Sequence, residues 1–121
     1  MKTCLVVDDS RVIRKVACAI LKELSFETEE AENGAQALVA CRRQMPDVIL
    51  VDWQMPSMSG VEFLRALNHE IFGRRPAVLF CTTENDPANI SEAVNAGAGD
   101  YIVKPYDRKI LATKLAEMGL V

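Results

Sequence analysis

The chain alternates short apolar runs with longer segments in which apolar residues recur every three or four positions. Residues 4–7, 48–51, 77–81 and 101–103 form continuous apolar runs of strand length, which is typical of strands buried on both faces of a parallel sheet. Residues 26–30 also have the composition of a strand but include three carboxylates, so we expect this strand at an edge of the sheet.

The segments between these strands have the period of amphipathic helices. They predict helices within residues 12–24, 37–45, 63–71, 90–97 and 107–119. In the first of them, Val12 and Val16 belong to the apolar stripe. Pro46 ends the second helix, and Asp86-Pro87 opens the fourth as N-cap and first-turn proline. A strand followed by a helix, repeated with right-handed crossovers, predicts an α/β fold: a doubly wound, five-stranded parallel sheet with helices on both faces.

Length and composition limit the classes of protein that this chain can be. Its 121 residues are of single-domain size and contain no linker or repeat, so we expect one domain over residues 1–121. A net charge of −3, from 14 basic and 17 acidic residues, argues against nucleic-acid binding, which requires a strong basic excess. No apolar stretch approaches the roughly 20 residues of a membrane span and no leader precedes the first strand, so we expect a cytoplasmic protein. The widely spaced cysteines, set among apolar neighbours, indicate reduced and buried thiols.

Polar residues follow the apolar runs at the point where each run ends. Asp8 and Asp9 follow the first strand, Asp52 the third, Thr82 the fourth and Lys104 the fifth. Because ligands of doubly wound sheets bind at the carboxyl ends of the strands, we expect these side chains to share one crevice. Taken singly, each has an ordinary explanation: Asp9 or Ser10 could be the N-cap of the first helix, and Lys104 could be a solvated side chain. Their common position at one edge of the sheet favours a site.

Three carboxylates in one crevice repel one another, and a bound cation would offset this repulsion. A hard divalent cation with oxygen ligands suits them, and Mg²⁺ is usually held by one or two carboxylates while phosphate oxygens fill part of its shell. Lys104 adds a positive charge and Thr82 a hydroxyl donor for the same anion. The set therefore predicts a phosphoryl-transfer site with an aspartate as acceptor.

Short motifs lie at these strand ends and at one helix end. They are Val7-Asp8-Asp9-Ser10, the D-x-x-M-P-x-M-x-G run of residues 52–60, Thr82-Thr83-Glu84, Asn95-Ala96-Gly97-Ala98 and Tyr101-Ile102-Val103-Lys104-Pro105. By these motifs the whole chain resembles the receiver domain of two-component response regulators. In length it is similar to the stand-alone chemotaxis type of this family. The resemblance implies a flavodoxin-like (βα)5 fold with strand order 2-1-3-4-5 and no output domain.

The resemblance also assigns a role to each acidic residue. Asp52 would be the phosphoacceptor. Asp9 and Asp52 would be carboxylate ligands of Mg²⁺, the backbone carbonyl of Gln54 would be a third ligand, and Asp8 would act through water. Phosphoryl transfer would then depend on positioning and charge neutralisation, without a general base.

Residues after the fourth and fifth strands would respond to the phosphoryl group. Lys104 would bind its oxygens, and the Lys104–Pro105 peptide bond would be cis. Thr82 would move to hydrogen-bond the phosphoryl group while Tyr101 changes its packing, which makes this pair the two-state element of a switch. As an ordinary core aromatic, Tyr101 would play no such part.

The lifetime of a phosphorylated form depends on in-line attack by water, and Gln54 and Glu84 are positioned to tune its rate. Thr83 stands where the family commonly has a small residue, which leaves the lifetime and the access to the phosphoryl group open. The resemblance thus implies no enzyme in the usual sense, but a phosphoacceptor that promotes its own phosphorylation and dephosphorylation.

Two kinds of protein partner are also implied. The phosphoryl donor would be a sensor histidine kinase or a histidine phosphotransfer protein, and an unidentified downstream protein would bind the face formed by the fourth helix, fifth strand and fifth helix. Candidate members of that face are Asn89, Glu92, Asn95, Tyr101, Tyr106, Arg108 and Lys109. The protein itself is expected to be a monomer, and phosphorylation-driven dimerisation through the same face stays open.

Other functions share parts of this pattern. A flavin carrier of the same fold would need a Ser/Thr/Gly-rich phosphate loop where this chain has Asp8-Asp9. A phosphohydrolase with an aspartyl-phosphate intermediate would need a D-x-D arrangement after the first strand and a cap domain. A degenerate receiver would act as a constitutive protein-interaction module, but the key side chains are all present.

Overall fold

The computed structural model describes residues 1–55, 57–70, 75–83 and 87–121. Strands and helices alternate along the chain. They are β1 (Thr3–Val7), α1 (Arg11–Glu23), β2 (Glu27–Ala31), α2 (Gly34–Arg43), β3 (Val48–Asp52), α3 (Gly60–Glu70), β4 (Ala77–Thr82), α4 (Pro87–Asn95), β5 (Asp100–Val103) and α5 (Arg108–Glu117). The strands pair in parallel in the order β2-β1-β3-β4-β5. The doubly wound parallel sheet and its strand order are therefore confirmed.

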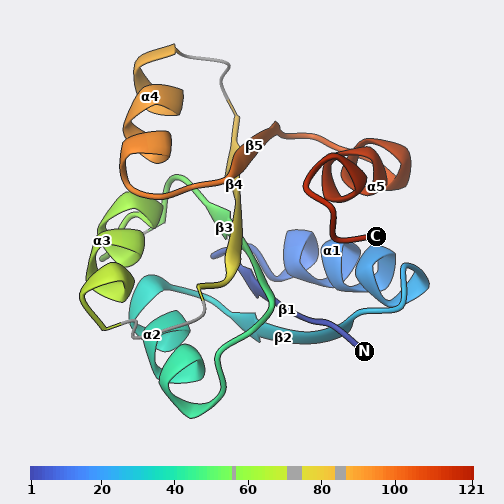
Figure 1. Ribbon diagram of the computed structural model, residues 1–121, viewed down its shortest axis with the longest axis horizontal. Helices are drawn as coiled ribbons and strands as arrows, with labels where there is room; N and C mark the ends of the chain where they lie inside the picture. Colours follow the sequence, from blue (N-terminus) through green and yellow to red (C-terminus); the bar gives the residue numbers. More distant parts are fainter. Residues whose placement is uncertain (56, 71–74, 84–86) are drawn as a thin grey trace.

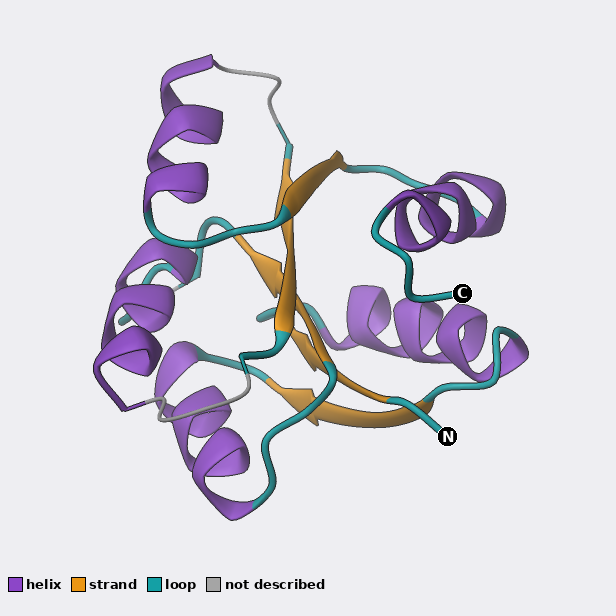
Figure 2. Ribbon diagram, in the orientation of Figure 1, coloured by secondary structure: helices purple, strands orange, loops and turns teal. Residues whose placement is uncertain are grey.

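The sheet lies between two layers of helices (Figures 1 and 2). α2, α3 and α4 cover one face, and α1 and α5 cover the other. Because side chains alternate along a strand, neighbouring residues enter different layers. Val6 and Leu50 lie in the apolar cluster with α1 and α5. Val7 and Val51 lie in the cluster with α2 and α3. The inner strands are thus apolar on both faces, which explains their continuous apolar runs.

The acidic strand lies at an edge of the sheet, as predicted. This strand, β2, pairs with β1 and spans residues 27–31 rather than 26–30. The difference arises because the N–H of Phe26 donates to the carbonyl of Leu21 in α1 at 2.9 Å, so pairing with β1 begins only at Glu27. Two carboxylates of β2 are half-buried and form ion pairs with the flanking helices: Glu30 with Arg14 and Lys15 of α1, and Glu29 with Arg43 of α2.

Local signals define where the helices begin. Ser10 caps α1, because its hydroxyl accepts a hydrogen bond from the N–H of Ile13 at 3.3 Å. Ser10 rather than Asp9 is thus the N-cap. The carboxylate of Asp9 does not cap the helix and lies with those of Asp8 and Asp52. α4 begins at Pro87, which confirms the first-turn proline, whereas its predicted N-cap, Asp86, lies outside the described residues.

The apolar stripes predicted from the sequence include residues that the helices do not bury. In α1, Val12 is 74% and Val16 is 51% exposed, and both line an open groove instead of the core. The helix predicted within residues 37–45 ends at Arg43, because Gln44 already has an extended backbone. Met45 is therefore outside the helix and exposed.

The four cysteines are free and buried, as predicted. Burial raises the pKa of the Cys41 thiol to about 11, so this thiol stays protonated and unreactive at neutral pH. Among the residues that the structure describes, no helix has the length and apolar character needed to cross a membrane.

Candidate functional site

Acidic side chains gather at the carboxyl ends of β1 and β3. Val7 pairs with Val51, so the next residues, Asp8 and Asp52, lie side by side where β1 and β3 end. One carboxylate oxygen from each of Asp8, Asp9 and Asp52 lies within 4.8 Å of the others. Asp8 is 3% and Asp52 is 7% exposed, whereas Asp9 faces solvent. The predicted convergence is thus present, as an acid cluster (Asp8, Asp9 and Asp52) that is open to solvent at Asp9.

Lys104 brings a positive charge against the acid cluster. Its Nζ donates to Asp8 Oδ2 at 2.6 Å and lies 3.1 Å from Asp52 Oδ1. Burial disfavours the charged form of Lys104, but the contacts with Asp8 and Asp52 outweigh it and raise the pKa of the ammonium group. Lys104 directly follows β5, and its backbone N–H donates to the carbonyl of Thr82 at 2.7 Å, which places this side chain. The Lys104–Pro105 peptide bond is cis, as the family resemblance implies.

Burial makes Asp52 an unusual carboxylate. Removal of its side chain from water raises its pKa from 3.8 to about 6, although the attraction of Lys104 opposes the shift. Repulsion from Asp8 and Asp9 acts in the same direction as burial. At neutral pH the group is ionised, and the folded protein is less stable because this charge is buried and also lies beside two other carboxylates.

We expect Asp52→Asn to stabilise the metal-free protein at neutral pH. The folded-state pKa lies above the unfolded value, so the proton on Asp52 stabilises the fold below about pH 4, and this stability is lost as the pH rises through about 6. The neutral asparagine avoids that loss, so the gain should be near zero below pH 4 and reach about 2–3 kcal/mol above about pH 6.5. Thermal unfolding of both proteins in EDTA, from pH 4 to 8, measures the difference. A gain that is the same at every pH would contradict the raised pKa.

A small cleft opens above Asp52. It is lined by residues at the ends of three strands and by one residue of α4: Asp52, Trp53, Gln54, Thr82, Thr83, Asn89 and Lys104. Thr82 is buried, and Gln54 and Thr83 are exposed. The cleft therefore brings together the predicted phosphoacceptor, lysine, switch threonine and Gln54. Glu84 lies outside the described residues.

Tyr101 lines a second, smaller pocket rather than this cleft. Thr82 contributes to both pockets. Trp53 packs edge-on against Phe80 beside the second pocket, with ring centroids 5.0 Å apart. Tyr101 is half-buried, and Nζ of Lys114 lies 5.2 Å from its ring centroid, within the range of a cation–π contact. Thr82 thus connects the surroundings of the acid cluster with those of Tyr101.

The predicted partner-binding face surrounds the edge strand β5, which runs between α4 and α5 (Figure 1). Four of the candidate residues are exposed: Glu92, Asn95, Arg108 and Lys109. The other three are half-buried: Asn89, Tyr101 and Tyr106. Arg108 pairs with Glu23 of α1 at 2.8 Å, which ties this end of α5 to the neighbouring helix.

The donor set fits a hard divalent cation. The acid cluster offers carboxylate oxygens only, and the backbone of Gln54 lies two residues beyond Asp52 at the same cleft. Oxygen donors of this kind suit Mg²⁺, whereas zinc sites are built mainly from nitrogen and sulfur. Within the described ranges of the chain, no second group of acidic, histidine or cysteine side chains has this arrangement.

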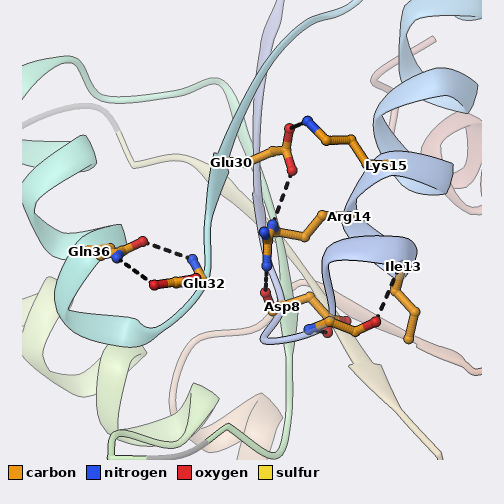
Figure 3. A network of polar contacts seen from close by, with 8 residues as sticks. Asp8, Ile13, Arg14, Lys15, Glu30, Glu32 and Gln36 are labelled. Carbon is orange, nitrogen blue, oxygen red and sulfur yellow. Dashed lines mark hydrogen bonds and ion pairs between the residues drawn. The ribbon is translucent and has the colours of Figure 1, made fainter.

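The sequence did not predict two residues that support the site. Arg14 donates through Nη1 to the carbonyl of Asp8 at 2.8 Å (Figure 3), and nothing in the sequence marks it, since a basic residue on a helix is usually solvated. Gly60, the first residue of α3, packs so closely that a Cβ there would lie 2.4 Å from the carbonyl oxygen of Asp52. The sequence does contain a signal for Gly60, because this glycine ends the 52–60 motif at the point where a helix begins.

Known proteins resemble this chain over almost its whole length. Residues 4–116 match the response regulator receiver domain. The chemotaxis protein CheY of Pseudomonas aeruginosa is 34% identical over 115 residues, which cover 94% of this chain and 93% of that protein. The phosphate regulon transcriptional regulatory protein PhoB of Escherichia coli is 33% identical over 111 residues, which cover 92% of this chain and 48% of that protein. The chain therefore spans about half the length of PhoB.

Solved structures agree with these sequence matches. The chemotaxis protein CheY4 of Vibrio cholerae has a TM-score of 0.91 and 33% identity, and the alignment covers 97% of this chain and 98% of that chain. A CheY-like receiver domain protein of Methanospirillum hungatei has a TM-score of 0.88 and 28% identity, with coverage of 98% and 93%. The similarity extends to both layers of helices, because it covers nearly all of each chain.

Proposed function

Since the chain belongs to the response regulator receiver domain family of two-component signalling, we propose that it works as a phosphorylation switch with Asp52 as the phosphoacceptor. The donor would be a phosphohistidine on a sensor histidine kinase or a histidine phosphotransfer protein. The phosphorylated form would bind a downstream protein. One observation carries the proposal: Asp52 is a buried carboxylate in a cleft, with Lys104 3.1 Å away and two further carboxylates in the same cluster.

The proposed reaction moves a phosphoryl group between two nucleophiles. An oxygen of Asp52 bonds to phosphorus while the P–N bond to the donor imidazole breaks. The electron pair of that bond stays on the imidazole, which leaves as a neutral ring because its other nitrogen carries the proton. With a pKa of about 6, Asp52 is already ionised at neutral pH, so it has no proton to lose and needs no general base.

The residues around Asp52 would prepare it for this reaction. Asp9, Asp52 and the backbone carbonyl of Gln54 would hold Mg²⁺, with Asp8 acting through water. When bound, the cation neutralises charge on the phosphoryl oxygens and on the carboxylates around them. Lys104 contacts Asp8 and Asp52 together, so its ammonium group lies within reach of a phosphoryl group on Asp52.

Thr82 and Tyr101 would transmit the modification to the surface. A phosphoryl group on Asp52 adds acceptor oxygens to the cleft that Thr82 lines. A shift of Thr82 toward them would leave room in the smaller pocket, into which the half-buried ring of Tyr101 can turn away from Lys114. Because Tyr101 belongs to β5, this movement would change the surface that α4, β5 and α5 present to the downstream partner.

The same site would also end the signal. Water that attacks the acyl phosphate on Asp52 in line must enter through the rim, where Gln54 and Thr83 are exposed. Gln54 would therefore tune the rate of hydrolysis. On this proposal the protein acts on no separate substrate, and instead promotes its own phosphorylation and dephosphorylation.

Intact mass after incubation with acetyl phosphate tests the proposal. We expect one phosphoryl adduct in the presence of Mg²⁺, and a rate at least about tenfold lower in EDTA, because charge on the transferred oxygens would then be neutralised by Lys104 alone. Circular dichroism of the protein in each incubation verifies that it is folded. If folded protein with Mg²⁺ gives no adduct, either from acetyl phosphate or from a phosphohistidine protein, it would instead be a degenerate receiver that serves as a constitutive interaction module.

A further inference from the structure

Arg14 reaches from α1 to the backbone of the acid cluster. Its Nη1 donates to the carbonyl oxygen of Asp8 at 2.8 Å, and its Nε donates to Glu30 Oε1 at 3.0 Å (Figure 3). The side chain is only 12% exposed, so the guanidinium has lost most of its contact with water. A cation buried to this extent is stable only when it is paired and hydrogen-bonded. Arg14 is therefore a fixed group rather than a solvated one.

The carbonyl that Arg14 contacts belongs to the peptide group between Asp8 and Asp9. The orientation of this peptide plane sets the direction in which the side chain of Asp9 leaves the backbone. The N–H of Asp8 donates to the carbonyl of Ala31 at 3.1 Å, and its Oδ1 accepts from the N–H of Ser10 at 2.9 Å. Arg14 fixes the carbonyl between these two contacts. Asp9 itself is exposed, so its position depends on this backbone more than on side-chain packing.

Glu30 holds the guanidinium of Arg14 in place. Glu30 lies on the edge strand β2 and accepts hydrogen bonds from both Arg14 and Lys15, the latter at 2.7 Å. The hydrogen bond from Lys15, and after it the one from Arg14, lower the pKa of Glu30 against the effect of burial, so Glu30 stays ionised. Arg14 thus links α1, the end of β1 and β2. Both contacts use the planar fork of the guanidinium, and a lysine cannot make the two together.

We propose that Arg14 is a positioning residue for the cation site: it holds the Asp8–Asp9 peptide so that Asp9 meets a divalent cation together with Asp52. This inference rests on the proposed function, because it requires that the acid cluster bind Mg²⁺. The expected effect of losing Arg14 on Mg²⁺ affinity is opposite in sign to that of its charge alone. Removal of a nearby positive charge would by itself strengthen the binding of a cation, whereas loss of the positioning contact weakens it.

Titration with Mg²⁺, followed by the fluorescence of Trp53 next to Asp52, tests this role. We expect Arg14→Ala to weaken Mg²⁺ binding about tenfold, as is usual when a partner that orients a metal ligand is lost. Arg14→Lys keeps the charge but loses the fork, so binding should still weaken several-fold. Lys15→Ala is the matched control, because Lys15 binds the same Glu30 through a side chain that is 59% exposed. Its effect should stay within about twofold.

The outcomes separate this inference from the proposed function. Wild-type or tighter Mg²⁺ binding by folded Arg14→Ala would overturn the positioning role alone, as would an equal loss in Lys15→Ala. No Mg²⁺ binding by the wild type would overturn the proposed function and this inference with it. If Arg14→Ala does not fold, Arg14→Lys decides, since it retains a cation beside Glu30: binding equal to that of the wild type overturns the role, and weaker binding at an unchanged Tm supports it.

Discussion

Asp52→Asn is expected to take up no phosphoryl group from acetyl phosphate under conditions that label the wild type completely. The change replaces a carboxylate with an amide of nearly the same shape, whose oxygen carries no formal charge and is a far weaker nucleophile. We expect the rate to fall by at least about a thousandfold, as it does when a nucleophile is removed from other sites. The fold should persist, because the raised pKa of Asp52 shows that burial favours a neutral group there. Intact mass of both proteins after the same incubation with Mg²⁺ measures the difference.

Asp100→Asn is a matched control for this experiment. Asp100 is also a carboxylate at a strand end, and Nζ of Lys114 lies 3.2 Å from it. It stands at the start of β5, however, whereas the acid cluster lies where the strands end. Its replacement should leave phosphoryl uptake within about twofold of the wild type. Uptake by Asp52→Asn at the wild-type rate would show that another residue is the acceptor, and peptide mass mapping of the adduct would then test Asp8 and Asp9 first.

The fold was predictable because its inner strands are buried on both faces. Such strands carry no polar residue until they end, so the runs 48–51 and 77–81 marked both the strands and the edge at which polar side chains gather. The helical stripes were less informative. Val12 and Val16 are as apolar as the buried residues of α1 yet exposed, because they line an open groove, and the period of a stripe does not show how much of it the protein covers.

The residues of the candidate site were predictable, but the contacts among them were not. An aspartate or a lysine at a strand end can be recognised from its type and position alone. The 2.6 Å contact between Lys104 and Asp8, in contrast, joins residues 96 positions apart and depends on the order of the strands. Arg14 and Glu30 are 16 positions apart and meet only because α1 packs against β2. No local pattern shows such a contact, so Arg14 had the sequence environment of a solvated residue.

Two glycines at equivalent helix positions allow the placement of Asp52 to be tested. Gly60 is the first residue of α3, and Gly34 is the first residue of α2. A Cβ on Gly34 would lie 2.6 Å from Sδ, 2.8 Å from Cγ and 3.0 Å from Cβ of Met58, so Met58 would have to shift, but only side-chain atoms meet the new methyl group. A Cβ on Gly60 would lie 2.4 Å from the backbone carbonyl oxygen of Asp52 and 2.7 Å from Cζ of Phe80. Backbone at the end of a central strand cannot move without moving Asp52 itself.

Gly60→Ala is therefore expected to destabilise the protein by about 2–3 kcal/mol, the upper part of the usual range of about 1–3 kcal/mol for overpacking a well-filled site. Gly34→Ala should destabilise the protein less, by about 1 kcal/mol, because its clash is with a flexible side chain and alanine is the better helix former. Urea unfolding of both variants measures the stability, and Mg²⁺ titration of Trp53 fluorescence measures the site. Relief of the clash must displace either α3 or the end of β3, so Gly60→Ala should also bind Mg²⁺ more weakly than Gly34→Ala does. Equal stability of the two variants would show that α3 shifts freely, and that its close approach to β3 does not position Asp52.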